Sequence, residues 1–359
     1  MRLLALPAVL STLAFTAIAA PGKSESKKPL PLLIWHGLGD RHDADGLHSV
    51  GDLVNEIHPD TYVYYIRLND KGDEDRKATF FGNVNDQIDQ VCSTMKEQKE
   101  LLDEAGIVRA DALGFSQGGQ FLRGLVQRCD GLRVRTLMTF GSQHNGISDV
   151  QECGTWDLLC KGAVALMRGN IWTEWVQTNV VPAQYYRTLD WETGELTEEY
   201  LEKSNFLADI NNEREGKEKK NETYKSRLSA LEMLALFVFE EDKTVIPRET
   251  GWFAEVNDTD SEDRHVIPLR ERAVYVEDWL GLRALDEKRG LACMSTPGDH
   301  MQLDDRVMRE AFDLYFGPER KSAPGPWKGK GRTDGCGFTL DGEKYAGAGQ
   351  VQVPFKQGL

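Results

Sequence analysis

The stretch Gly114-Phe115-Ser116-Gln117-Gly118 decides the fold. It fits the Gly-x-Ser-x-Gly pattern of a nucleophile elbow, in which the flanking glycines allow a sharp turn between a strand and a helix. An apolar strand pattern at residues 110–115 precedes it, and a helical pattern at residues 118–128 follows. The context predicts an α/β-hydrolase fold that presents the Ser116 hydroxyl at the carboxyl end of a sheet. A serine in an ordinary strand-to-helix turn is the alternative, and it would leave the motifs below unexplained.

Strand and helix patterns alternate on both sides of this stretch, which predicts a mostly parallel sheet flanked by helices. The strand patterns lie at residues 31–35, 61–66, 136–140, 234–239 and 291–294, and the main helical patterns at 84–102 and 306–315. Between residues 142 and 231 the alternation gives way to helical, aromatic-rich sequence. We expect this segment to be a helical cap inserted into the α/β-hydrolase domain.

The two ends of the chain differ from its middle in composition and periodicity. Arg2 precedes an apolar run at residues 3–20 that contains Ala17-Ile18-Ala19, which predicts a secretory signal peptide over residues 1–19 rather than a membrane anchor. The domain would then occupy residues 20–317. Residues 318–359 are rich in Gly and Lys without sustained periodicity and are predicted to be a flexible tail.

Composition excludes several classes of partner. The chain has 359 residues and a formal charge of −15, which disfavours binding to nucleic acid or to anionic surfaces through clustered basic side chains. No paired CxxC or HExxH spacing suggests a metal, and we expect neither metal nor cofactor. Entry into the secretory pathway makes the six cysteines candidates for disulfides. Sequons at Asn221 and Asn257 predict glycosylation.

A serine nucleophile needs a histidine base, which in this fold follows the acid in the chain. Three histidines come after Ser116, namely His144, His265 and His300. His144 comes too early, directly after the next strand, and His265 sits in a charged stretch typical of a solvated loop. His300 follows the strand pattern at 291–294 and precedes the last helix, so it is the predicted base.

The acid is expected at the carboxyl end of the strand at 234–239, where Glu240, Glu241 and Asp242 follow one another. We predict Asp242. Asp299 is a rival by adjacency to the base, but a neighbouring side chain rarely reaches Nδ1 of the next residue, and a turn role fits it better.

An oxyanion formed during ester cleavage needs two preorganised donors. In this fold we expect them to be the backbone N–H of Gln117 and that of Leu38 in the loop Gly37-Leu38-Gly39. The second assignment rests on position in the chain, because glycine loops after strands are common.

Longer motifs in this chain resemble those of the palmitoyl-protein thioesterase family, whose lysosomal members remove S-acyl chains from proteins. The matching segments span roughly residues 30–316 and are Ile34-Trp35-His36-Gly37-Leu38-Gly39-Asp40, Gly82-Asn83-Val84-Asn85, Gly114 to Arg123, Phe206-Leu207-Ala208-Asp209-Ile210-Asn211, Leu280-Gly281-Leu282 and Gly298-Asp299-His300-Met301-Gln302-Leu303. The resemblance implies the same nucleophile, acid and base as above, and disulfides Cys92–Cys129 and Cys153–Cys160.

The chain also departs from the family pattern. Animal members often carry a cysteine pair where this chain has Arg41 and His42, and the tail lies outside the resemblance. Cys293 and Cys336 have no partner implied by it. We expect Cys293 to be a buried free thiol, with a bridge to Cys336 as the less favoured alternative.

The resemblance implies a thioester hydrolase that removes palmitoyl groups from S-acylated proteins or peptides in the lysosome, in a vacuole or outside the cell. A secreted lipase or carboxylesterase would use the same residues on oxygen esters, and a lipid carrier without catalysis is a third reading. We expect an apolar groove in the cap to hold the acyl chain. Its candidate residues are Leu158, Leu159, Val164, Leu166, Met167, Ile171, Trp172, Trp175, Val180 and Val181.

Overall fold

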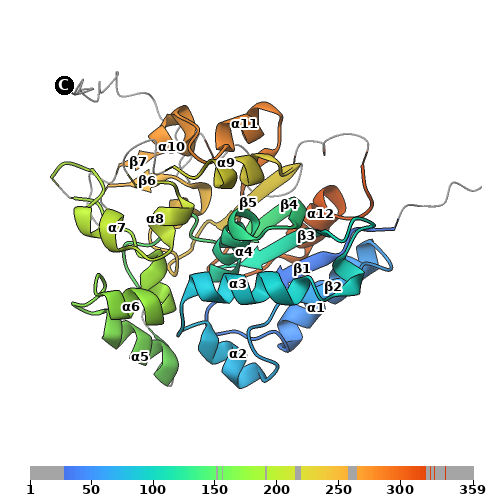
Figure 1. The fold of residues 1–359 in the computed structure, drawn as a ribbon, viewed down its shortest axis with the longest axis horizontal. Helices are drawn as coiled ribbons and strands as arrows, with labels where there is room; N and C mark the ends of the chain where they lie inside the picture. Colours follow the sequence, from blue (N-terminus) through green and yellow to red (C-terminus); the bar gives the residue numbers. More distant parts are fainter. Residues whose placement is uncertain are drawn as a thin grey trace, which may run out of the picture.

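The fold is known from a computed structural model (Figure 1). The structure describes residues 28–150, 153–155, 157–190, 192–214, 220–257, 265–320, 324, 327 and 336. The predicted signal peptide and most of the predicted tail lie outside these residues.

The centre of the molecule is a six-stranded sheet in the order β2-β1-β3-β4-β5-β8. Every neighbouring pair in it is parallel, which confirms the predicted architecture of an α/β-hydrolase fold. The strands are β1 (Leu32–Trp35), β2 (Val63–Tyr65), β3 (Val108–Phe115), β4 (Leu132–Phe140), β5 (Met233–Phe239) and β8 (Leu291–Thr296). A separate antiparallel pair is formed by β6 (Glu255–Val256) and β7 (Val266–Ile267).

Helices cover both faces of the sheet because its strands are apolar on both sides. Leu32 and Ile34 pack with α1 (Asp45–Ile57) and α12 (Asp305–Tyr315), whereas Leu33 and Trp35 face α3 (Val84–Met95) and α4 (Gln117–Arg128). Successive side chains of a strand point to opposite faces, so one strand feeds two cores. In Figure 1, α3 and α4 cross in front of the sheet. The remaining helices near this layer are α2 (Gly72–Ala78), α10 (Ala273–Val276) and α11 (Leu282–Glu287).

Among its described residues, the connection from β4 to β5 contains helices, turns and isolated β-bridges, but no strand of the sheet. These are α5 (Leu158–Met167), α6 (Glu174–Asn179), the 3₁₀ turn η2 (Val181–Tyr185), α7 (Glu198–Lys203), α8 (Leu207–Ile210) and α9 (Glu222–Ser229). Helices α5 and α6 lie together at one end of the molecule, away from the sheet (Figure 1). They share a small core with residues that come before and after them in the chain, made of Phe80, Ala163, Met167, Val176, Val180 and Ala183. In contrast, α9 packs directly on α4 and belongs to the helical layer of the sheet.

A buried ion cluster ties the inserted segment to the rest of the domain. Arg187 pairs with both Glu213 and Glu255, and Arg272 donates to Glu255 at 2.8 Å. The hydroxyl of Tyr200 donates to the second oxygen of Glu213. Buried charges cost much solvation, so each must keep its partner, and the cluster specifies one docking geometry for this segment.

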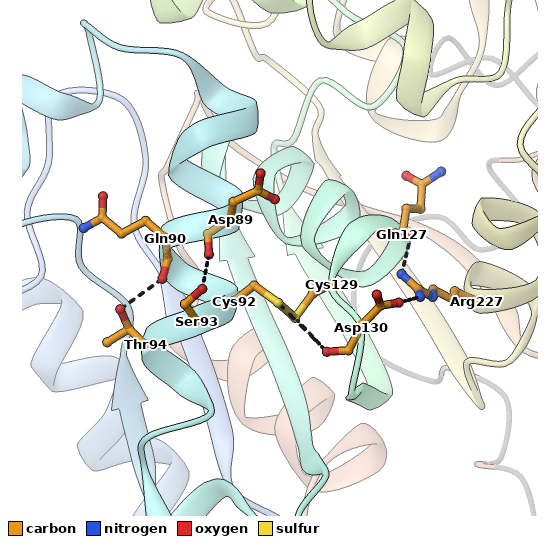
Figure 2. Close-up of a disulfide and its surroundings, with 9 residues drawn as sticks. All are labelled: Asp89, Gln90, Cys92, Ser93, Thr94, Gln127, Cys129, Asp130 and Arg227. Carbon is orange, nitrogen blue, oxygen red and sulfur yellow. Dashed lines mark hydrogen bonds and ion pairs between the residues drawn. A yellow bond between two sulfur atoms is a disulfide. The ribbon is translucent and has the colours of Figure 1, made fainter.

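The structure contains both disulfides that the resemblance implies. Cys92–Cys129 joins α3 to the end of α4. Figure 2 shows the neighbouring residue Asp130 paired with Arg227 of α9, so the bridge and the ion pair fasten the same corner. Cys153–Cys160 closes a short loop at the start of α5.

The expectation of a free thiol at Cys293 is wrong. Cys293 on β8 is bonded to Cys336, which is buried. Trp327 is also buried, with its ring packed edge-on against Phe237 of β5. These two residues of the predicted tail are therefore part of the core, because they supply apolar surface that the sheet would otherwise leave uncovered.

Replacing Cys336 with serine should lower the free energy of unfolding more than replacing Cys153 does. The Cys293–Cys336 bridge spans 43 residues and Cys153–Cys160 spans 7. Chain entropy gives stabilisations of about 4 and about 2 kcal/mol for loops of these sizes. Urea unfolding of the two single variants measures the difference. Equal losses of unfolding free energy in the two variants would contradict the expectation that the longer loop makes the Cys293–Cys336 bridge the more stabilising one.

Candidate active site

Ser116 occupies a strained turn between β3 and α4. Its backbone has φ 52° and ψ −126°, outside the regions that side chains with a Cβ prefer. The glycines around it permit close packing: a Cβ on Gly114 would lie 2.4 Å from Cα of Gly119, and one on Gly118 would lie 2.4 Å from the carbonyl oxygen of His36. Hence the local sequence dictates the turn, and the turn lifts the hydroxyl out of the sheet.

The structure brings Ser116, His300 and Asp242 together in a hydrogen-bonded row. Nε2 of His300 lies 2.9 Å from Oγ of Ser116, and Nδ1 lies 2.7 Å from Oδ2 of Asp242. The other carboxylate oxygen of Asp242 accepts hydrogen bonds from the backbone N–H groups of Thr244 and Val245. Since Nδ1 donates to the carboxylate, Nε2 is left to accept the serine proton.

The other candidates considered from sequence lie elsewhere. His144 is fully buried, its Nε2 bonded to Thr139 and its ring stacked on Phe253, and burial lowers its pKa well below the usual value. His265 lies beside the β6–β7 pair, where its N–H donates to Asn257. Asp299 is exposed and lies in the turn before the base. None of the three is in the row.

Both predicted oxyanion donors belong to segments beside the nucleophile. Gln117 is the first residue of α4, whose N-terminal end carries a partial positive charge directed at Ser116. The loop with Leu38 lies against Ser116 on another side, since a Cβ on Gly37 would be 3.2 Å from the serine Cβ. Leu38, Ser116 and His300 line the same pocket.

This pocket has a volume of about 400 Å³ and extends toward the inserted helices. Its apolar side chains come from several elements and are Leu38, Phe80, Ile147, Val150, Pro182, Val245 and Met301. The ten cap residues expected to form a groove are not among its lining residues. Met167, Val180 and Val181 are instead buried in cores, whereas Leu158, Leu166 and Trp175 are exposed. Helical sequence patterns alone do not tell which of these apolar residues are buried and which are exposed.

The pocket wall also includes a polar group that sequence reasoning missed. Gln143 is 3% exposed, and its Oε1 has no hydrogen-bond partner. A buried amide without a partner is uncommon and costly. Its only sequence signal was its place just after β4, at the carboxyl edge of the sheet.

Among the described residues no cluster of His, Cys, Asp and Glu side chains is placed to hold a metal ion. Within the same residues, no helix is both long and apolar enough to cross a membrane.

The family model for palmitoyl protein thioesterase matches residues 31–300. The chain is 33% identical to palmitoyl-protein thioesterase 1 of Caenorhabditis elegans, over 85% of this chain and 97% of that protein. The chain belongs to the palmitoyl-protein thioesterase family. As a member of this thioesterase family it is an enzyme, a hydrolase of the serine class.

Two further relatives show the breadth of the family. The chain is 36% identical to a palmitoyl-protein thioesterase-dolichyl pyrophosphate phosphatase fusion of Schizosaccharomyces pombe, over 77% of this chain and 42% of the fusion. It is 28% identical to a Drosophila melanogaster protein named lysosomal thioesterase PPT2 homolog, over 75% of this chain and 85% of that protein.

At Arg41 and His42 the chain departs from the family pattern, and here His42 forms hydrogen bonds with the carboxylate of Asp75. Nδ1 of His42 lies 3.0 Å from Oδ2 of Asp75, and the same oxygen accepts the N–H of His42 at 2.9 Å and lies 3.0 Å from Nε2 of His36. The other oxygen of Asp75 accepts the N–H of Leu68 at 2.7 Å. One carboxylate therefore holds both ends of the loop that carries Leu38.

Asp75 is fully buried on α2, and no motif in the sequence marked it. Burial alone would raise its pKa, but the hydrogen bonds from His36 and from the backbone outweigh burial and lower the pKa to about 2. A carboxyl group whose pKa is depressed by folding stabilises the fold above its unfolded pKa, and this contribution disappears as the pH falls through the folded value.

We expect Asp75→Asn to lower the free energy of unfolding by about 2 kcal/mol near pH 5, the equivalent of the pKa depression. The difference from the unmodified protein should shrink between pH 4 and pH 2, where Asp75 itself takes up a proton. Denaturant unfolding at several pH values measures this. Asp73→Asn on the exposed side of α2 is the matched control. A loss that stays constant down to pH 2 would show that the charge of Asp75 is not what holds the loop.

Proposed function

We propose that this enzyme hydrolyses the thioester bond between long-chain acyl groups, palmitoyl among them, and cysteine residues of proteins or peptides. The observation that carries the proposal is the hydrogen-bonded row of Ser116, His300 and Asp242, of which Ser116 and His300 line a pocket with several apolar side chains. Membership of the thioesterase family supports the choice of thioesters over oxygen esters.

In the first step Oγ of Ser116 attacks the thioester carbonyl carbon, and its proton passes to Nε2 of His300. The oxyanion that forms would accept hydrogen bonds from the backbone N–H groups of Gln117 and Leu38. The C–S bond then breaks, the cysteine thiolate takes the proton from His300, and the acyl group remains on Ser116.

In the second step water gives a proton to His300 and adds to the acyl-enzyme, and the proton returns to Ser116 as the fatty acid leaves. Asp242 keeps Nδ1 protonated and stabilises the positive imidazole in both steps. The backbone N–H groups of Thr244 and Val245 hold its carboxylate in place for this role.

The pocket supplies a site for the acyl chain. Phe80, Ile147 and Val245 give it apolar walls beyond Ser116, and its volume of about 400 Å³ lies within the range of small-molecule sites. We therefore place the acyl chain in this pocket rather than in a groove formed by the ten cap residues.

We further propose that the protein works in the lysosome, in a vacuole or outside the cell. Three disulfides fit an oxidising compartment, and relatives in the family are named lysosomal thioesterases. Glycosylation at Asn221 and Asn257 belongs to the same proposal. Asn257 is exposed, and Asn221 is half-buried at the start of α9, where its Oδ1 accepts backbone N–H groups.

Ser116→Ala and Asp242→Asn should each lower kcat/KM for a palmitoyl thioester by about 10⁴-fold or more, because the first removes the nucleophile and the second leaves the imidazole in the wrong tautomer. Assays of palmitoyl-thioester hydrolysis with the purified variants measure the loss of kcat/KM. Asp299→Asn is the control, since this exposed neighbour lies outside the row. An unchanged rate in Asp242→Asn together with a collapse in Asp299→Asn would reverse the assignment of the acid.

Lengthening the acyl chain of soluble thioesters should raise kcat/KM until the pocket is filled, since each buried methylene contributes up to about 0.8 kcal/mol before ordering costs. Rates measured below the micelle concentration for chains of increasing length test this. The matching oxygen esters distinguish a thioesterase from a lipase, and no hydrolysis of either would favour a lipid carrier. A steady decline beyond short chains would exclude the palmitoyl assignment.

A further inference from the structure

The solvent-facing side of α5 carries two exposed leucines. The exposed side of this helix carries Leu158, Lys161, Gly162, Ala165 and Leu166, which follow the spacing i, i+3, i+4, i+7, i+8. Leu158 is 78% exposed and Leu166 is 38% exposed. The opposite side, with Ala163 and Met167, is buried in the small core shared with α6. The outer face of the helix therefore carries two exposed leucines with Lys161 between them, and the inner face is apolar.

Two exposed leucines are unusual on the outer face of a surface helix, where charged and polar residues normally cover the side away from the core. Across the described residues the exposed large apolar side chains are Leu158, Leu166, Trp175 and Val276. Three of these four lie on α5 and on its packing partner α6. Exposed apolar residues that gather in this way mark an interaction surface, whereas scattered ones do not.

The face begins at the rim of the pocket. Gly154, Asp157 and Cys160 line the pocket, and Leu158 follows Asp157 directly. The rim is fastened by the Cys153–Cys160 disulfide and by Arg76, whose Nη2 lies 2.9 Å from a carboxylate oxygen of Asp157. Any surface that covers α5 therefore also borders the entrance to the pocket.

Charge separates this region from the rest of the protein. Residues 158–175 contain the cations Lys161 and Arg168 and the single anion Glu174, although the chain as a whole has a charge of −15. The acidic composition argued against anionic surfaces for the molecule overall, but this segment is an exception.

We propose that the outer face of α5 docks the enzyme on a phospholipid bilayer, with Leu158 and Leu166 in the boundary between headgroups and acyl chains. Lys161 and Arg168 then lie at the level of the lipid phosphates, as long basic side chains do at an interface. A helix of ten residues is too short to span the bilayer and lies in its plane. Docking would bring the pocket entrance to the surface in which acyl chains of lipidated proteins are embedded.

Flotation with vesicles of equal parts phosphatidylcholine and phosphatidylglycerol tests the docking without any reference to catalysis. We expect the full chain to float with the vesicles and the double variant Leu158→Glu, Leu166→Glu to bind more than tenfold more weakly, because two apolar side chains no longer leave water. Val276→Glu is the matched control, since Val276 is 53% exposed on α10, outside the α5–α6 pair. It should bind as the unmodified protein does.

Two further measurements fix the interpretation. The double variant Leu158→Glu, Leu166→Glu should keep its rate on a soluble short-chain thioester, which would show that it is folded. A second double variant, Lys161→Gln with Arg168→Gln, should bind the mixed vesicles more weakly, with a smaller loss on vesicles of pure phosphatidylcholine. The proposal is overturned if the full chain stays out of the vesicle fraction, if the double variant binds as tightly, or if the face instead forms a dimer that the double variant abolishes. Failure of the proposed hydrolysis would appear separately, as absence of thioesterase activity in the unmodified protein.

Discussion

The strained backbone at Ser116 is the constraint on which the rest of the site depends. A positive φ at a residue with a side chain is unfavourable, so the surroundings must compensate for it. They do so by packing: Gly114 lies against Gly119, Gly118 lies against the carbonyl of His36, and the neighbouring strands β1 and β4 hold β3 in register. This arrangement points the serine hydroxyl away from the sheet and sets the N-terminus of α4 directly behind it.

The remaining parts of the site reach this serine from distant points in the chain. Asp242 and His300 follow β5 and β8, which are neighbours in the sheet, and parallel strands end at the same edge. The loop after β1 approaches from the other side and is held by the Asp75 carboxylate on α2. Strain at one residue, a parallel sheet and one buried carboxylate together hold the parts of the site in this arrangement.

The inserted segment between β4 and β5 connects the site to its surroundings. One side of it contributes Ile147 and Pro182 to the pocket and is anchored to the domain by the ion pairs of Arg187. Its far end, α5, presents two exposed leucines to solvent next to the pocket rim. The same insertion thus shapes the pocket in which we propose that the acyl chain binds, and it supplies the surface that we propose for membrane docking.

Sequence alone determined what depends on neighbours in the chain. The strand–elbow–helix pattern predicted Ser116 as the nucleophile, the alternation of patterns correctly predicted the parallel sheet, and the order of elements favoured His300 among three histidines. Asp242 was predicted from its place after a strand, where Glu240 and Glu241 occupy equivalent positions. Its hydrogen bond to His300 depends on how the turn after β5 folds.

Only the tertiary structure decided what depends on contacts between distant residues. Asp75 belongs to no motif and gains its role from a histidine 39 residues away, and Cys293 finds its partner 43 residues later in a segment without periodicity. Helical spacing could not tell which apolar cap residues face the core and which face solvent. The physical reason is the same in each case: local patterns record the preferences of a residue and its neighbours, whereas burial and pairing are set by whatever the folded chain brings against that residue.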